Sequence, residues 1–217
     1  MGILGVLRQV AAALGWPSGR GLTPLQLGDR LLAEGKVREA LAAFLRHAEQ
    51  YPADAADAYC RAAKCCLRVR HQDLPREVVR GRTLAAASSR DAAEQLFRKA
   101  LAVKPKHFEA LIGLSELVPP RSAERLHLLE RAIIARPHSP TLLAIGDFYR
   151  DVLNEPLRAY HYYQRAQQQS PREREAYRRL AEVCRLLGRE NEAQHWLSEL
   201  ENLSRRLDEV DEVYEQQ

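Results

Sequence analysis

Four prolines of this chain each follow a large apolar residue by eight positions. The prolines are Pro52, Pro105, Pro137 and Pro171, and the apolar residues are Phe44, Phe97, Leu129 and Tyr163. Successive prolines are separated by 53, 32 and 34 residues. Because self-similarity at about 34 residues is typical of arrays of one helical unit, the spacing predicts a repeat protein.

The clearest unit begins at Thr23. Thr23, Pro24 and Gln26 form a helix-start signal, with a hydroxyl that accepts backbone N–H groups and a reciprocal glutamine three residues on. Gly28 is small enough to let a neighbouring helix approach, and Gly35 is placed to end the first helix. Leucine and alanine outnumber valine and isoleucine, which favours helix over sheet. The unit is therefore predicted to be a helical hairpin.

These residues resemble the tetratricopeptide repeat family. The first unit matches at Leu27-Gly28, Leu31, Gly35, Ala40, Phe44 and Pro52, with His47 where the family has alanine. The fifth unit matches at Tyr177, Leu180-Ala181, Cys184, Gly188 and Ala193. The fourth matches at Ile145-Gly146, Tyr149, Ala159, Tyr163, Ala166 and Pro171, with one residue inserted near Asn154, and its His161-Tyr162-Tyr163 run is slightly similar to Sel1-type repeats. The resemblance implies an all-α, right-handed superhelical solenoid of about five antiparallel helix-turn-helix repeats with a long C-terminal capping helix.

The expected organisation has three parts. Residues 1–20 form an N-terminal amphipathic helix and linker, 21–200 form the solenoid, and 201–217 form the acidic end of the C-terminal helix. The repeats are expected at 21–54, 55–107, 108–139, 140–173 and 174–200. The second repeat carries an Arg-rich insertion at about 70–89, which we expect to be an extra helix or a solvated loop.

The two ends of the chain have amphipathic patterns. Ile3, Leu7, Val10 and Leu14 fall on one helical face, which predicts a short helix docked on the first repeat, with weak membrane contact of residues 1–15 as the alternative. Trp196, Leu200, Leu203, Leu207, Val210 and Tyr214 alternate in steps of four and three. This stripe predicts a helix that covers the last hairpin, and self-pairing into a homodimer beyond Leu203 is the alternative.

No constellation for catalysis is recognised. HExxH, GxxxxGK[ST], GxSxG and GxGxxG are absent from the sequence, so we expect no enzyme activity, catalytic residue, metal site or cofactor. The four cysteines, Cys60, Cys65, Cys66 and Cys184, form no CxxC pair. Reduced thiols favour a cytoplasmic protein, and the alternative is a location peripheral to a membrane through the N-terminal helix.

Binding of a peptide or protein segment is the expected function, so that the chain acts as a scaffold or adaptor. In the family that the chain resembles, solvent-facing positions of the first helices line the concave groove. The resemblance assigns to this groove Arg61, Lys64, Arg68, Glu109, Ile112, Glu116, Asp147, Arg178, Glu182 and Arg185. Of these, Arg61, Lys64, Arg68, Arg178 and Arg185 are the expected contacts to acidic side chains of a partner.

Charge and composition bear on the choice of partner. The net charge is +4, while Ser198 to Gln217 carries two arginines against seven acids, so the rest of the chain is strongly basic. A basic body favours an acidic partner, with RNA as the alternative. The acidic tail from Asp208 to Glu215 is a candidate competitor for the groove. A clamp for the acidic C-terminus of heat-shock chaperones is not expected, because no asparagine stands at a groove position.

Overall fold

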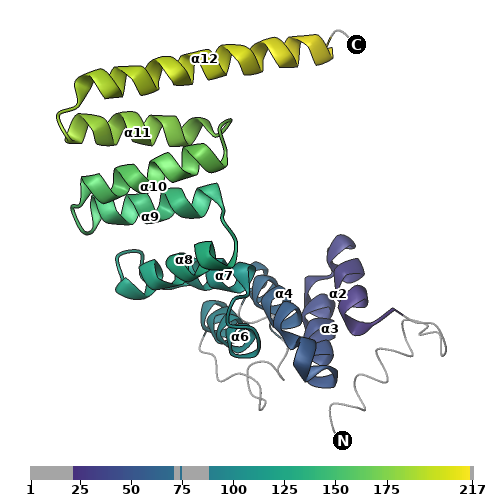
Figure 1. The fold of residues 1–217 in the computed structure, drawn as a ribbon. Coiled ribbons are helices and arrows are strands. Elements are labelled where there is room, and N and C mark those ends of the chain that lie inside the picture. Colours follow the sequence, from purple (N-terminus) through teal and green to yellow (C-terminus); the bar gives the residue numbers. More distant parts are fainter. Residues whose placement is uncertain (1–21, 71–73, 75–87, 216–217) are drawn as a thin grey trace, which may run out of the picture. The chain divides into compact units, whose positions relative to one another are not determined.

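The computed structural model describes residues 22–70, 74 and 88–215, with side chains described as far as Leu207 (Figure 1). Within these residues every regular element is helical, which confirms the all-α fold class. The chain divides into two compact units, Met1–Val103 and Lys104–Gln217. The predictions for residues 1–20 and for most of the insertion at 70–89 lie outside the described residues.

The helices follow one another as hairpins, and short turns join them except between α4 and α6, which residues 69–88 separate. The described helices of the first unit are α2 (Pro24–Ala33), α3 (Val37–Gln50), the 3-10 helix η1 (Pro52–Asp54), α4 (Ala55–Arg68) and α6 (Ser89–Val103). Those of the second unit are α7 (Phe108–Leu117), α8 (Ala123–Ala135), α9 (Ser139–Asp151), α10 (Pro156–Gln169), α11 (Arg174–Leu186) and α12 (Glu190–Glu215). In the described part of the chain, no helix is both long enough and apolar enough to cross a membrane.

The first hairpin begins as its sequence predicts. The Thr23 hydroxyl accepts a hydrogen bond from the Gln26 amide at 3.3 Å, and the Thr23 amide donates to Oε1 of Gln26 at 2.9 Å. Pro24 occupies the first turn of α2, where a missing N–H costs nothing. The capping box is therefore confirmed.

The regularly spaced apolar residues form the cores of the two units. Phe44 and Phe97 are fully buried in the first unit, and Tyr163 is fully buried in the second. Leu129 is 3% exposed and packs in the same cluster as Tyr163. Each proline of the spacing therefore follows the second helix of a hairpin, eight residues after the side chain that fills its core.

Two glycines permit close packing within their hairpins. A Cβ atom on Gly28 of α2 would stand 2.3 Å from Cε1 of Phe44 on α3. The same distance separates a Cβ on Gly146 of α9 from Cε1 of Tyr163 on α10. Because real Cβ atoms do not approach ring carbons so closely, only glycine fits at these positions. The predicted close approach at Gly28 is confirmed.

In three hairpins, a residue with a left-handed backbone conformation follows the first helix. Gly35 and Gly188 have φ values of 76° and 69°, as expected for glycine after a helix. In the α9–α10 turn the positive φ falls on Asn154, at 54°, and the amide of Glu155 donates to the carbonyl of Tyr149 at 2.8 Å. Asparagine tolerates this conformation better than other non-glycine residues. The longer turn accommodates the residue inserted in the fourth repeat.

Helix α12 covers α11 and continues past it. Trp196 packs against the core of the second unit and meets the Tyr177 ring edge-on at 6.0 Å between centroids. Leu203 is 6% exposed. Figure 1 shows the C-terminal part of α12 extending beyond the end of α11. The prediction of a long C-terminal capping helix is confirmed.

Candidate functional site

Ion pairs join first helices of successive hairpins. In the first unit, a guanidinium nitrogen of Arg61 on α4 pairs with Asp29 on α2. In the second unit, Arg179 of α11 pairs with Asp147 of α9. Arg150 of α9 also donates to Glu182 of α11, at 3.1 Å. In each case 32 residues separate the partners, close to one repeat length.

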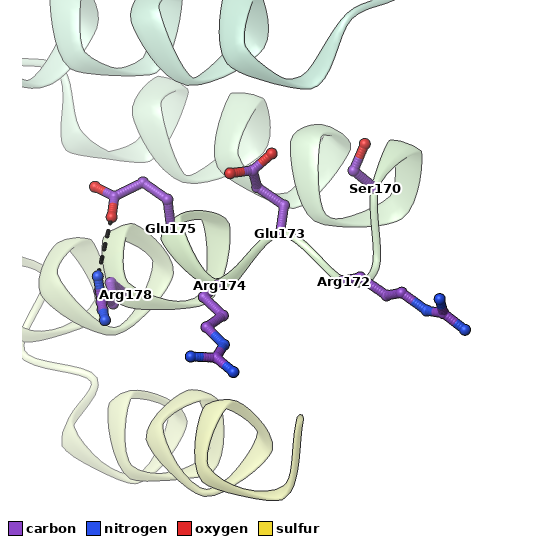
Figure 2. Close-up of a pocket in the computed structure, with 6 residues that line it drawn as sticks. All are labelled: Ser170, Arg172, Glu173, Arg174, Glu175 and Arg178. Carbon is purple, nitrogen blue, oxygen red and sulfur yellow. Dashed lines mark ion pairs between the residues drawn. The ribbon is translucent and has the colours of Figure 1, made fainter. Parts of the chain in front are cut away.

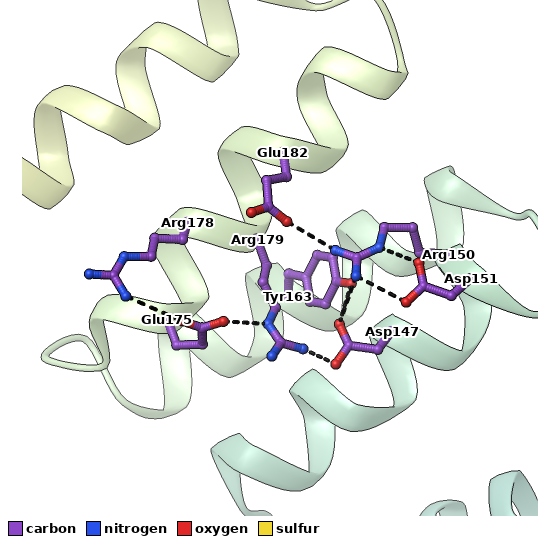
Figure 3. A network of polar contacts seen from close by, with 8 residues as sticks. All are labelled: Asp147, Arg150, Asp151, Tyr163, Glu175, Arg178, Arg179 and Glu182. Atoms are coloured by element: carbon purple, nitrogen blue, oxygen red, sulfur yellow. Dashed lines mark hydrogen bonds and ion pairs between the residues drawn. The ribbon is translucent and has the colours of Figure 1, made fainter. Parts of the chain in front are cut away.

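The pairs of the second unit belong to one network (Figure 3). Asp147 accepts a hydrogen bond from the hydroxyl of Tyr163 at 2.8 Å, in addition to its ion pair with Arg179. Arg179 also donates to Glu175 on its own helix at 2.9 Å. Burial raises the pKa of Tyr163, so this phenol stays neutral and keeps its donor proton. The network therefore ties the side of α9 to both α10 and α11.

Arg150 forms the second half of the network. It donates to both carboxylate oxygens of Asp151, at 2.6 and 3.0 Å, and lies 3.6 Å from Asp147. The hydrogen bond to Asp151 raises the pKa of Arg150 and holds the pKa of that carboxyl below its usual range. Most of the charge on this surface is therefore balanced within the protein.

The groove residues predicted in the second unit have partners within the chain. Asp147 and Glu182 belong to the network. Arg178 lies 3.5 Å from Glu175, and Arg185 lies 3.8 Å from Glu190, yet both arginine side chains are more than half exposed. An exposed pair at such a distance is weak, so both remain accessible to a ligand.

The α7 positions differ from one another. Glu109 pairs with Arg136 at 3.1 Å, and the Arg136 guanidinium lies over the Phe108 ring at 3.8 Å. Glu116 is exposed. Ile112 was expected to face solvent, but it is partly buried and packs against the apolar core of the second unit. Ile112 is therefore only partly accessible, and its place in the groove stays a prediction.

A basic face of α4 contrasts with this balanced network. It consists of Arg61, Lys64, Leu67 and Arg68, which we call the α4 stripe. Lys64 and Arg68 are exposed and have no ion-pair partner among the described residues. Leu67, between them, is 45% exposed. The stripe thus combines one cation paired with Asp29, two cations without an ion-pair partner in the described part of the chain, and an accessible apolar side chain.

The opposite face of α4 is buried. Cys65 and Cys66 are at most 1% exposed. Burial raises the pKa of Cys65 to about 11 and that of Cys66 to about 12. Both thiols are therefore protonated at neutral pH and serve as small apolar core residues, as their positions predict.

A shallow hollow of about 560 Å³ lies at the α10–α11 turn. It is lined by Ser170, Arg172, Glu173, Arg174, Glu175 and Arg178. Figure 2 shows that the Arg172 and Arg174 side chains point apart and do not converge on one point. The hollow therefore lacks the geometry of an anion-binding pocket.

Aromatic residues of the second unit are covered by arginines. Tyr149 and Tyr162 stack with their centroids 5.3 Å apart. The guanidinium of Arg158 lies 5.4 Å from the Tyr149 centroid, and that of Arg165 lies 5.6 Å from the Tyr162 centroid. These rings already have partners, so they offer few free faces on which nucleic-acid bases could stack.

Sequence reasoning missed one partner of each ion pair between first helices. Asp29, Arg150 and Arg179 were not assigned to the site, although each pairs with a first helix one repeat away. Opposite charges recurring at an interval of 32 residues were the available signal. A search for that interval in first helices would have found all three pairs.

Solved structures resemble this chain in fold. A MamA RS-1 double mutant aligns with a TM-score of 0.64 and 18% identity over 84% of this chain and 93% of that chain. A crystal structure of MamA aligns with a TM-score of 0.64 and 15% identity, over 84% of this chain and 96% of that chain. MamA 41-end from Desulfovibrio magneticus RS-1 aligns with a TM-score of 0.61 and 18% identity, over 84% of this chain and 93% of that chain. No family model matches the chain, and no curated protein matches its sequence. The likeness shows the fold alone, which is that of a tetratricopeptide-like helical repeat protein.

Proposed function

We propose that this protein is a non-catalytic scaffold that binds a protein segment along the first helices of its hairpins. The α4 stripe is its main contact for acidic side chains. The observation that carries the proposal is the presence of Lys64 and Arg68 on one exposed helix face without ion-pair partners among the described residues. Unpaired surface cations steer and orient an acidic partner.

Leu67 adds an apolar contact to this charge. Its 45% exposure leaves part of a large apolar side chain in water beside two cations. Burial of apolar area contributes about 25 cal/mol per Å². A segment with acidic residues flanking an apolar residue fits the stripe better than a purely acidic one.

The balanced network supports the same choice of surface. Asp147, Glu182 and Arg150 would have to give up internal partners before they could bind another protein. Replacing one ion pair by another gains little net energy. We therefore assign the network to holding α9 and α11 together, and Arg178 and Arg185 to secondary contacts.

The alternative partner is RNA, and the covered aromatic rings of the second unit favour protein over it. Stacking on free aromatic faces supplies much of the affinity for unpaired nucleotides. Binding to phosphates alone would fall steeply with salt, because each contact releases counterions.

The experiment is a quantitative affinity capture with the full chain, followed by identification of the bound proteins. We expect the K64E/R68E variant to capture at least tenfold less of the bound protein than the native chain. The matched control is K104E/K106E, which makes the same change of net charge at two exposed lysines that do not belong to the stripe. Equal loss in both variants would show that net charge alone is responsible. Capture that disappears on nuclease treatment would favour RNA.

A further inference from the structure

A histidine stands at the N-terminus of α7, at a position where a hydroxyl or a carboxylate is the usual cap. His107 is the N-cap residue of this helix and is only 4% exposed. Its Nδ1 atom accepts a hydrogen bond from the backbone amide of Ala110 at 3.2 Å. The imidazole therefore satisfies one of the amides that the first turn of a helix leaves without an intrahelical partner.

This hydrogen bond defines the protonation state that the cap needs. A ring nitrogen that accepts from an N–H carries no proton, so the proton of the neutral imidazole lies on Nε2 of His107. A proton added at Nδ1 would remove the acceptor. It would also place a positive charge at the helix N-terminus, where the macrodipole disfavours cations. The capped first turn of α7 therefore requires a neutral His107.

A carboxylate lies beside the same nitrogen. Oε2 of Glu109 is 3.8 Å from Nδ1 of His107. The other oxygen of Glu109, Oε1, is 3.1 Å from the guanidinium of Arg136. Arg136 thus holds the carboxylate next to the ring and leaves one of its oxygens facing Nδ1. A protonated Nδ1 would have an anionic acceptor within reach of a small rotation.

Other charged groups near this turn come from α8 and from the start of α9. Arg131 donates to a carbonyl of the turn before α7 at 2.9 Å. Arg136 lies over the Phe108 ring at 3.8 Å, and His138 meets the same ring edge-on at 5.3 Å between centroids. Because arginine keeps its charge in proteins, the groups of this cluster that can change charge are the two histidines and Glu109.

We propose that protonation of His107 at Nδ1 is an acid switch that opens the first turn of α7. The imidazolium donates its Nδ1 proton to Oε2 of Glu109, and the amide of Ala110 loses its acceptor. The first turn of α7 then frays, because an amide there is left unsatisfied. All of these residues belong to the unit Lys104–Gln217, so the switch is complete within one unit.

The switch has a consequence for binding. Glu109 is one of the predicted groove residues, so an imidazolium beside it would neutralise an anion that a ligand could otherwise meet. This consequence rests on the proposed function, whereas the switch itself does not. The experiments therefore measure the switch without any ligand, and failure of the proposed function leaves their results unchanged.

Helix α8 provides an internal control. Its N-cap residue is Ser122, whose hydroxyl accepts a hydrogen bond from the amide of Arg125 at 3.2 Å. The two caps have the same length, but a serine hydroxyl keeps its acceptor lone pairs at every physiological pH. A loss of protection at Ala110 that Arg125 does not share would therefore report the imidazole.

The first test follows the full native chain by NMR from pH 7.5 to pH 5.0, across the range in which imidazoles change charge. The nitrogen shifts of the His107 ring report its tautomer and its protonation. We expect a proton on Nε2 alone at pH 7.5. As the ring takes up its second proton, the protection of the Ala110 amide from solvent exchange, corrected for the intrinsic rate, should fall about tenfold. Protection of the Arg125 amide should stay unchanged.

The second test uses variants. H107N keeps a capping acceptor that does not titrate, so Ala110 should stay protected at both pH values. H127Q and H138Q each remove another histidine and should retain the response. E109Q removes the anionic partner of the imidazolium, so the fall in protection should move to lower pH. E116Q makes the same change of charge on the same helix and should leave the midpoint in place.

Several results would overturn the proposal. They are a proton on Nδ1 at pH 7.5, a ring that stays neutral down to pH 5.0, and a ring that titrates while Ala110 keeps its protection. Equal losses at Ala110 and Arg125 would indicate general unfolding of the unit instead. A response that persists in H107N but disappears in H138Q would assign it to the other ring. If H107N does not fold, the ring and amide measurements on the native chain decide.

Discussion

Gly146 of α9 faces the ring of Tyr163 of α10 so closely that an added Cβ atom would stand 2.3 Å from Cε1. Gly28 and Phe44 repeat this relationship in the first unit. In both hairpins a glycine gives the space that a fully buried ring occupies. The packing of the first and fourth repeats is thus equivalent, although a longer turn joins the two helices of the fourth.

Substitution of either glycine should destabilise its unit. We expect G28A to lower the free energy of unfolding by about 1–3 kcal/mol, because a methyl group would overpack the contact with Phe44. Urea unfolding measures this loss. F44L removes part of the ring, so G28A/F44L should lose less than the sum of the single variants. Strict additivity would contradict the contact.

Asn154 should respond to substitution according to its backbone conformation. Its φ of 54° predicts that N154A loses about 1 kcal/mol of stability, since alanine disfavours the left-handed region. N154G should change stability by only a few tenths of a kcal/mol. Thermal unfolding compares the two variants. G35A is the reference, because it also places alanine at a position with positive φ. Equal losses in N154A and N154G would assign the effect to the side chain.

The ion pair between Asp147 and Arg179 should be measurable by a double-mutant cycle. Both side chains are less than a third exposed, so we expect D147N and R179Q to be coupled by about 1 kcal/mol. Glu201 and Arg205, 3.9 Å apart and largely exposed, form the control pair with coupling near zero. Equal coupling energies in the two cycles would show that the network does not strengthen the Asp147–Arg179 ion pair.

Alkaline pH should destabilise the first unit through its buried thiols. Above the ordinary thiol pKa of about 8.5 the unfolded chain releases protons, whereas Cys65 and Cys66 stay protonated in the folded chain up to pH 11–12. Stability is therefore complete below pH 8.5 and falls as pH rises, by at most about 1.4 kcal/mol per pH unit for each thiol. Urea unfolding from pH 7.5 to 10.5 should give a flatter profile for C65A/C66A than for the native chain.

The helices were predictable because their signals are local. Thr23 with Gln26, Gly35, and the apolar residue eight positions before each proline each depend on one hairpin. Asn154 was located as the inserted position for the same reason. The spacing thus predicted which residues end helices and which fill cores.

The partners of the surface residues were not predictable by the same reasoning. Arg61, Asp147 and Glu182 were assigned to a groove from their register, and this assignment stays a prediction. Their ion pairs depend on how one hairpin packs on the next, which register within a single repeat does not describe. The contact of Ile112 with the core of the second unit was likewise outside what register describes.

The ion pairs between successive first helices have a consequence for how the chain unfolds. In a repeat protein, cooperativity depends on the coupling of each hairpin to its nearest neighbours. Here part of that coupling is electrostatic, through Asp29 with Arg61 and through Arg150 with Glu182. Salt weakens such coupling more than it weakens the apolar cores. Rising ionic strength should therefore let neighbouring hairpins open one at a time, so that fraying at the ends replaces all-or-none melting.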